Sequence, residues 1–113
     1  MPIVVNEDSL IGAVQEAFQE QFPFLKIEFC PLELSASNEI SRTNSFGQYN
    51  GFRTGSIVID SSTTVADLDR AFRKIFGLSA RIYRKSGKAW LEIKLTGSWT
   101  LQEQNDQGKA LSV

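Results

Sequence analysis

The chain lacks histidine and has a single cysteine, Cys30, among its 113 residues. Histidine is the most common general acid–base residue and metal ligand, so its absence removes Ser-His-Asp and Cys-His catalysis. One cysteine without histidine also argues against a zinc site and cannot form an intramolecular disulfide. The sequence contains no glycine-rich phosphate-binding string of the P-loop or dinucleotide type. We therefore expect no enzymatic activity, no metal and no cofactor.

The remaining candidates for chemistry are Cys30 and the acidic residues Asp67 and Asp69. Residues two apart on a helix do not share a face, so the two acids fit capping and dipole interactions better than a carboxylate dyad. A lone cysteine is more often a small apolar side chain than a nucleophile. We expect no catalytic role for any of the three.

Long apolar runs are absent as well. No uninterrupted run approaches the roughly 20 residues of a membrane-spanning helix. The first residues also lack the basic start and apolar core of a signal peptide. We expect no membrane partner and a reducing, cytoplasmic setting.

Charge is nearly balanced overall but is unevenly distributed. The net charge is −1, yet residues 1–69 carry 3 basic and 10 acidic side chains, whereas residues 70–94 carry 8 basic and one acidic. Such asymmetry indicates either an anionic partner or pairing between the two halves of a folded domain. The length and the 42% hydrophobic content are ordinary for one globular domain, which we assign to residues 1–113.

One pattern occurs twice in the chain. Residues 11–24 and 65–78 align at an offset of 54, which pairs Val14 with Leu68, Phe18 with Phe72 and Phe22 with Phe76. Apolar residues at this spacing predict an amphipathic helix in each copy. Pro23 and Gly77 then end the two helices. The repeat indicates either an internal duplication or a common core pattern that arose twice.

Alternation of apolar and polar residues predicts strands over Phe24–Cys30, Ser56–Asp60, Ala80–Lys85 and Ala89–Thr96. Asn6 or Ser9 is placed to cap the first helix, and Thr64 is placed to cap the second. Thr100 and Glu103 form a capping box for a short C-terminal helix. We expect Gly108 to end that helix. Met1–Val5 is either an unpaired arm or an extra strand.

This order of elements predicts an α+β domain. We expect two helix–strand–strand units that form one four-stranded antiparallel sheet with both main helices on one face. The arrangement resembles a ferredoxin-like sandwich whose first strand has moved to the end of the chain, and the resemblance concerns topology and implies no function. The alternatives are a ubiquitin-like roll and two hairpins that do not share a sheet.

A long segment, residues 31–55, is rich in serine, asparagine and glycine. Loops of this length inside compact domains are usually functional or disordered. Three aromatic residues and an arginine stand near its end, so we regard it as a flexible or partner-binding loop with these candidate contacts: Phe46, Tyr49, Phe52 and Arg53.

A second candidate surface is the side of the sheet that faces away from the helices. Alternation places aromatic and basic residues there, namely Arg81, Tyr83, Lys85, Trp90 and Lys94. Tyrosine, tryptophan and arginine are enriched at protein interfaces, which favours a non-enzymatic module that binds a protein partner or forms a homodimer. The same residues could stack on bases and contact phosphates, so single-stranded nucleic acid is the less favoured alternative. A third interpretation is that the terminal segment with Trp99 and Leu101 folds across the sheet and buries Trp90.

Overall fold

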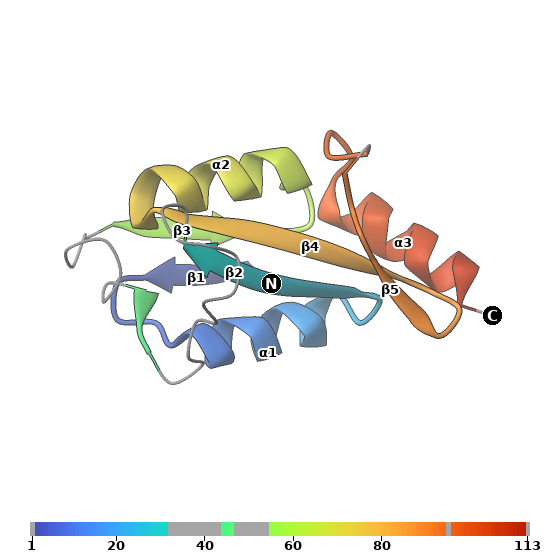
Figure 1. The fold of residues 1–113 in the computed structure, drawn as a ribbon, viewed down its shortest axis with the longest axis horizontal. Coiled ribbons are helices and arrows are strands. Elements are labelled where there is room, and N and C mark those ends of the chain that lie inside the picture. The colour runs from blue at the N-terminus through green and yellow to red at the C-terminus, as the bar shows by residue number, and fades with distance from the viewer. Residues whose placement is uncertain (1, 32–43, 47–54, 95, 113) are drawn as a thin grey trace.

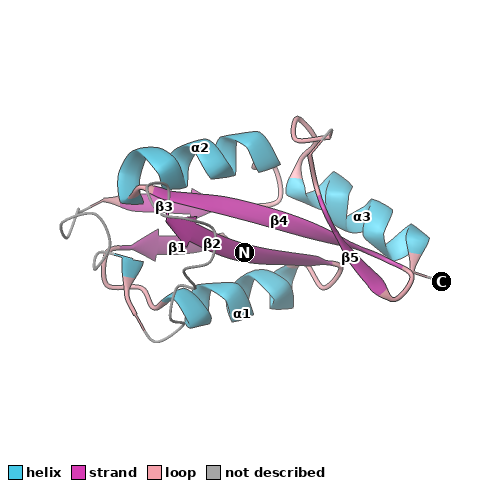
Figure 2. Ribbon diagram, viewed as in Figure 1, coloured by secondary structure: helices cyan, strands magenta, loops and turns pink. Residues whose placement is uncertain are grey.

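The computed structural model describes residues 2–31, 44–46, 55–94 and 96–112, which form an α+β fold (Figures 1 and 2). Its strands are β1 (Ile3–Asn6), β2 (Leu25–Pro31), β3 (Ser56–Ile59), β4 (Leu78–Ser86) and β5 (Ala89–Glu92). Its helices are α1 (Ile11–Gln21), α2 (Val65–Phe76) and α3 (Leu101–Leu111). The sequence patterns predicted these elements, although β5 ends at Glu92 and not at Thr96. Of the two alternatives for the N-terminal residues, the extra strand is the one that forms.

The described strands are divided between two antiparallel sheets and do not form the single four-stranded sheet that we expected. β1 pairs with β3, while β2, β4 and β5 form a second sheet in the order β2-β4-β5. The N-terminal residues cause the difference. They form a strand that places Val4 opposite Val58, so β3 pairs with the start of the chain instead of joining the β4–β5 hairpin.

α1 lies along the margin of β2 and α2 along the margin of β4 (Figure 1), and buried residues of both helices belong to the core cluster that covers one face of the three-stranded sheet. α1 contacts β1 and β2, whereas α2 contacts β3 and β4, so each helix joins one strand of each sheet. One hydrophobic core results, because Val5 and Ile57 of the two-stranded sheet belong to the same buried cluster as Ile27 and Ile82 of the three-stranded sheet.

The helix ends follow local chemistry at α2 more closely than at α1. Thr64 caps α2 by accepting the Asp67 amide at 3.1 Å, and Gly77 ends it with a φ of 68° that favours glycine. α1 begins after Leu10 without a side-chain cap, so the expected cap from Asn6 or Ser9 was wrong. Ser9 Oγ accepts the Asn6 amide at 3.0 Å and closes the turn before the helix instead.

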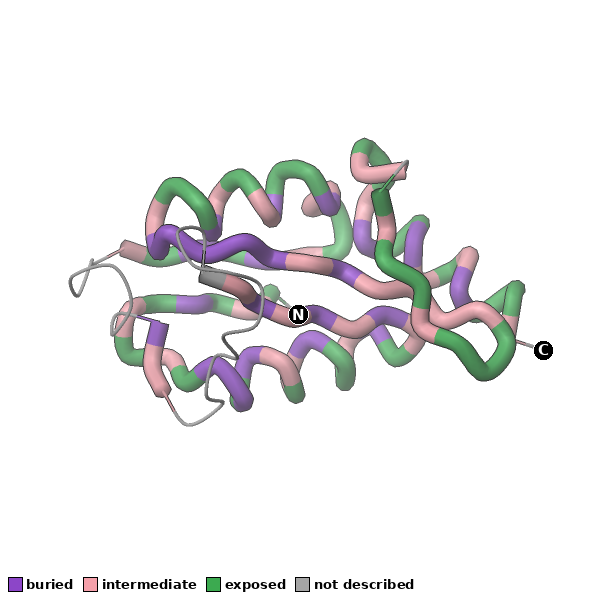
Figure 3. Tube along the Cα trace, viewed as in Figure 1, coloured by how far each residue is buried: buried purple, intermediate pink, exposed green. Residues whose placement is uncertain are grey.

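Phe46 belongs to the core and not to an exposed binding loop. Its side chain is fully buried, and its ring centroid lies 5.0 Å from that of Phe29 and 5.5 Å from those of Phe72 and Phe76. This aromatic cluster joins β2 and α2 to the described residues 44–46. Our expectation that Phe46 contacts a partner is therefore corrected. Burying a large apolar ring in the core stabilises the folded state, and leaving it exposed does not. Figure 3 shows how buried residues alternate along the strands around this cluster.

The C-terminal helix has the predicted start but a different end. Thr100 and Glu103 form the capping box, with Glu103 Oε1 accepting the Thr100 amide at 2.9 Å. Gly108 does not end α3, which continues to Leu111. Glycine occurs there because α3 packs closely on the chain at this point: a Cβ atom at 108 would lie 2.9 Å from Phe24 Cβ.

A buried polar contact fixes where α3 lies. Gln104 is fully buried, accepts a hydrogen bond from Arg84 Nη1 at 2.9 Å and donates one to the Thr96 carbonyl at 2.7 Å. Arg84 alternates with Tyr83 and Lys85, so α3 packs on the core side of β4. The terminal helix therefore does not cross the other face and cover Trp90.

Candidate interaction surface

The three-stranded sheet has one face in the core and one face outside it. Ile27, Phe29, Ala80 and Ile82 are buried, and the residues between them point to the other side because successive side chains of a strand alternate. We call this side the open face. It consists of Lys26, Glu28, Cys30, Arg81, Tyr83, Lys85, Trp90 and Glu92.

The strand register gives the open face alternating charge. Arg81 of β4 stands opposite Glu28 of β2. Tyr83 stands between Lys26 on one side and Glu92 on the other. Side chains directly opposite each other in an antiparallel pair are close enough to interact. Arg81 thus has an acidic group opposite it and Tyr83 has one beside it, so the face is not a uniform basic patch.

A salt bridge on β2 reinforces this alternation. Lys26 Nζ lies 3.3 Å from Glu28 Oε1, and each side chain is 44% exposed. Exposed pairs of this kind contribute little to stability. Their importance here is for recognition, since a partner would meet carboxylates beside Lys26 and Arg81.

Tyr83 lies at the centre of the open face, and the pKa of its phenol depends on the charges of that face. Partial burial raises the pKa of its phenol, and the carboxylates of Glu28 and Glu92 raise it further, while Arg81 opposes the increase. Burial and the two carboxylates disfavour the phenolate, whereas the guanidinium of Arg81 favours it. The hydroxyl consequently stays protonated over the physiological range and is available as a hydrogen-bond donor.

The structure brings together most of the sheet residues that the sequence indicated. Arg81, Tyr83, Lys85 and Trp90 share the open face, with Lys85 and Trp90 directly opposite each other. Lys94 follows the end of β5 and is exposed. It lines a hollow beside α3 together with Arg84, Leu91, Ile93 and Thr96. The remaining loop candidates, Tyr49, Phe52 and Arg53, lie outside the described residues.

Sequence reasoning missed the contribution of β2 and the role of Glu92. The alternation over 24–30 had already placed Lys26 and Glu28 on the polar side of their strand. Which strand lay beside β2 was not given by that pattern, so the acidic residue opposite Arg81 could not be counted. Pairing of β2 with β4 supplies this information.

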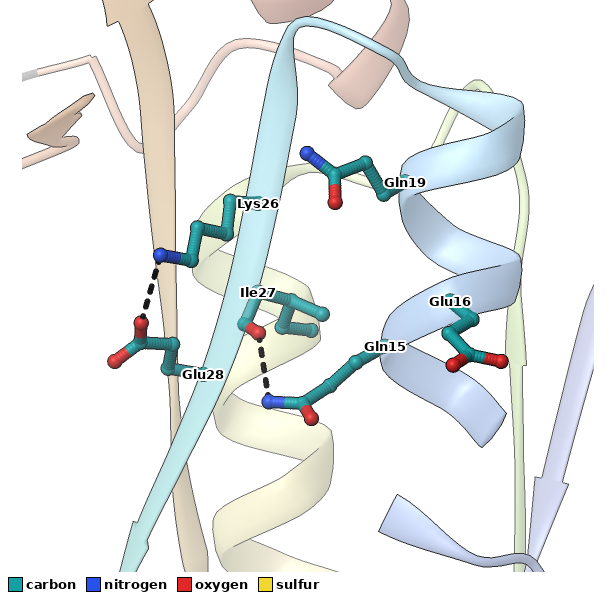
Figure 4. Close-up of a pocket in the computed structure, with 6 residues that line it drawn as sticks. All are labelled: Gln15, Glu16, Gln19, Lys26, Ile27 and Glu28. Atoms are coloured by element: carbon teal, nitrogen blue, oxygen red, sulfur yellow. Dashed lines mark hydrogen bonds and ion pairs between the residues drawn. The ribbon is translucent and has the colours of Figure 1, made fainter. Parts of the chain in front are cut away.

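A shallow hollow of about 260 Å³ borders the open face between α1 and β2 (Figure 4). Gln15 reaches across it and donates from Nε2 to the Ile27 carbonyl at 3.1 Å. The other lining residues that the figure labels are Glu16, Gln19, Lys26 and Glu28. Five of its six lining side chains are polar or charged, which is unlike the mostly apolar lining of small-molecule sites. We therefore regard the hollow as a margin of the open face.

In the part of the chain that the structure describes, no three cysteine, aspartate or glutamate side chains come together to hold a metal ion. None of the described helices has the length and apolar character needed to cross a membrane.

Comparison with models of known protein families, with curated proteins and with solved structures gives no match to this chain.

Proposed function

We propose that this chain is a non-enzymatic protein-interaction module that binds a protein partner through the open face of the β2-β4-β5 sheet. The observation that carries the proposal is the register that places Glu28 opposite Arg81 and Glu92 opposite Tyr83. Two aromatic side chains surrounded by charges of both signs suit a protein surface, which also carries both signs. Aromatic residues and arginine are the usual centres of binding energy in such interfaces.

Nucleic acid remains the second candidate, because Arg81, Lys85, Tyr83 and Trp90 do share one face. Phosphate backbones require net positive charge, and binding should weaken steeply with salt. Two carboxylates interleaved with the cations oppose such binding. The protein-binding proposal therefore predicts no association with labelled single-stranded RNA or DNA at tens of micromolar protein in low salt, measured by fluorescence anisotropy.

Site-specific photo-crosslinking tests the protein-binding proposal. A photoreactive amino acid at position 83 should form crosslinks to a partner protein in a lysate of the source cells. The same amino acid at position 58, which is 55% exposed on the other sheet, is the matched control. Crosslinks of equal yield from both positions would contradict a binding site that is confined to the open face.

The identified partner then allows a quantitative test. Tyr83→Ala and Trp90→Ala should each weaken binding by about tenfold to a hundredfold, as for aromatic residues at interface centres. Val58→Ala should change the dissociation constant less than about twofold, since its side chain lies on the other sheet. Calorimetric titration of the purified proteins measures all three, and equal effects would refute the assignment.

A further inference from the structure

Most strand edges in the described structure are beside a helix or another strand. Gln15 of α1 bonds the outer edge of β2 at the Ile27 carbonyl. The carboxylate of Asp69 on α2 accepts a hydrogen bond from the Ala80 amide of β4 at 2.8 Å, in the part of β4 that extends beyond β5. α1 also contacts β1, and α2 contacts β3. These contacts occupy backbone groups that would otherwise pair with another chain.

The outer edge of β5 differs from these edges. β5 is the last strand of its sheet, and no described strand pairs with its far side. Ile93 donates its amide to the Ile82 carbonyl at 2.9 Å, so Ile93 and, two residues earlier, Leu91 direct their backbone groups toward β4. Hydrogen bonding alternates along an antiparallel strand. The amide and carbonyl groups of Trp90 and Glu92 consequently point away from the sheet.

Apolar surface accompanies this edge. Leu91 is 55% exposed although it stands on the side of β5 that continues the core face. It lines the hollow beside α3 with Ile93. An edge strand that combines outward backbone groups with an exposed leucine is a template for strand addition.

We propose that β5 pairs antiparallel with β5 of a second copy of this chain, which extends the sheet as β2-β4-β5-β5′-β4′-β2′. The charge order at this edge selects this partner. When two β5 strands pair about Trp90, Lys88, the turn residue directly before β5, comes next to Glu92 of the other copy at each end of the paired segment, so two opposite-charge pairs form. Pairing about Leu91 would instead bring Lys88 next to Lys94 of the second copy. The twofold axis at Trp90 is thus the favoured one.

This pairing goes beyond the open-face proposal, because it uses the backbone edge of β5 and is independent of any heterologous partner. The twofold axis is perpendicular to the extended sheet, so it places both open faces on the same side. A homodimer would then present two copies of the aromatic surface around Tyr83 to one partner.

Sedimentation velocity over a range from about 10 µM to about 1 mM tests the proposal, since dimerisation follows mass action. The wild-type chain should show a reversible monomer–dimer equilibrium. Lys88→Glu and Glu92→Lys should each weaken dimerisation by about tenfold, because each turns two attractions into repulsions. An equimolar mixture of the two variants should dimerise again, and so should the doubly exchanged variant. This rescue also demonstrates that both variants fold.

Tyr83→Ala separates this proposal from the open-face proposal. It should leave the dimer intact while it weakens heterologous binding. A strict monomer at about 1 mM, or a dimer that is insensitive to the charge exchange, would overturn the β5 pairing. A dimer that is lost in Tyr83→Ala and unaffected by the charge exchange would also overturn it and would assign self-association to the open face.

Discussion

Glu28 of β2 and Arg81 of β4 stand directly opposite each other across the open face of the three-stranded sheet. They are 53 positions apart in the chain, in the acidic and basic parts respectively. Their pairing shows how part of the uneven charge distribution is resolved within one folded domain. Substitutions at the acidic positions can therefore change the charge of the open face.

Reversing the acids should create nucleic-acid binding. Glu28→Lys together with Glu92→Lys leaves the open face with cations around Tyr83 and Trp90, which is the arrangement that binds single strands. We expect this double variant to bind labelled oligonucleotides in low salt and to lose affinity steeply as salt increases. The matched control is Glu20→Lys on α1 with Asp106→Lys on α3, two exposed acids outside the open face, which has the same net charge. Equal binding by both variants would mean that net charge, and not the face, is responsible.

Ionisation of Tyr83 should require a higher pH than that of an ordinary tyrosine, because burial first and then Glu28 and Glu92 raise its pKa. The unfolded-state pKa of tyrosine is about 10. The folded state holds the phenol proton more tightly than the unfolded state does. The stabilisation that results is complete below pH ~10 and is lost as the pH rises through the pKa of Tyr83 in the folded state. Absorbance titration of the phenolate in a Tyr49→Phe background measures it. Glu28→Gln should lower the pKa of Tyr83, whereas Glu20→Gln on α1 should not change it.

Phe46→Ala should destabilise the fold strongly. The substitution empties space among Phe29, Phe72 and Phe76, and such large-to-small changes cost about 3–5 kcal/mol. Urea unfolding monitored by tryptophan fluorescence measures the loss. Leu91→Ala, at a side chain that is 55% exposed, should cost less than about 1 kcal/mol. An unchanged unfolding midpoint for Phe46→Ala would restore Phe46 as a surface residue.

Gly108→Ala should also destabilise the protein, although alanine favours helix by about 1 kcal/mol over glycine. The added Cβ would lie 2.9 Å from Phe24 Cβ, 3.0 Å from the Phe24 oxygen and 3.2 Å from Arg84 Cγ. Overpacking of this kind costs about 1–3 kcal/mol. At Gly97 an added Cβ would have its nearest neighbour at 3.8 Å. Gly97→Ala is therefore the control, and thermal unfolding that ranks it below Gly108→Ala in stability would contradict the close packing of α3.

Asp69→Ala should cost more than Asp67→Ala, although each acid has an arginine partner on α2. Asp69 bonds Arg73 Nε at 2.7 Å and also accepts the Ala80 amide, whereas Asp67 forms an exposed pair with Arg70. Loss of the acceptor leaves a part-buried amide unpaired, at about 1–3 kcal/mol, while an exposed pair is worth about 0–1 kcal/mol. Chemical unfolding of both variants tests the difference. Equal costs would mean that water replaces the carboxylate at Ala80.

Local signals in the sequence determined the elements. Apolar spacing fixed α1 and α2, and the Thr64 cap and the capping box from Thr100 to Glu103 fixed two helix starts. The alternation over Ala80–Lys85 and Ala89–Thr96 placed the two strands of the β4–β5 hairpin. These features depend on contacts between residues close in the chain, so a pattern of a few residues contains enough information. The aromatic and basic part of the open face was predicted for the same reason.

Tertiary structure alone decided the division into two sheets, the burial of Phe46 and the alternating charge of the open face. Each depends on which distant segments meet: β1 with β3, Phe46 with α2, and Glu28 with Arg81. Strand partners are chosen by the burial of the whole core, and no single segment encodes that choice. The sequence therefore indicated that a basic aromatic surface exists, and only the fold placed acids among its cations, which supports the protein partner over nucleic acid.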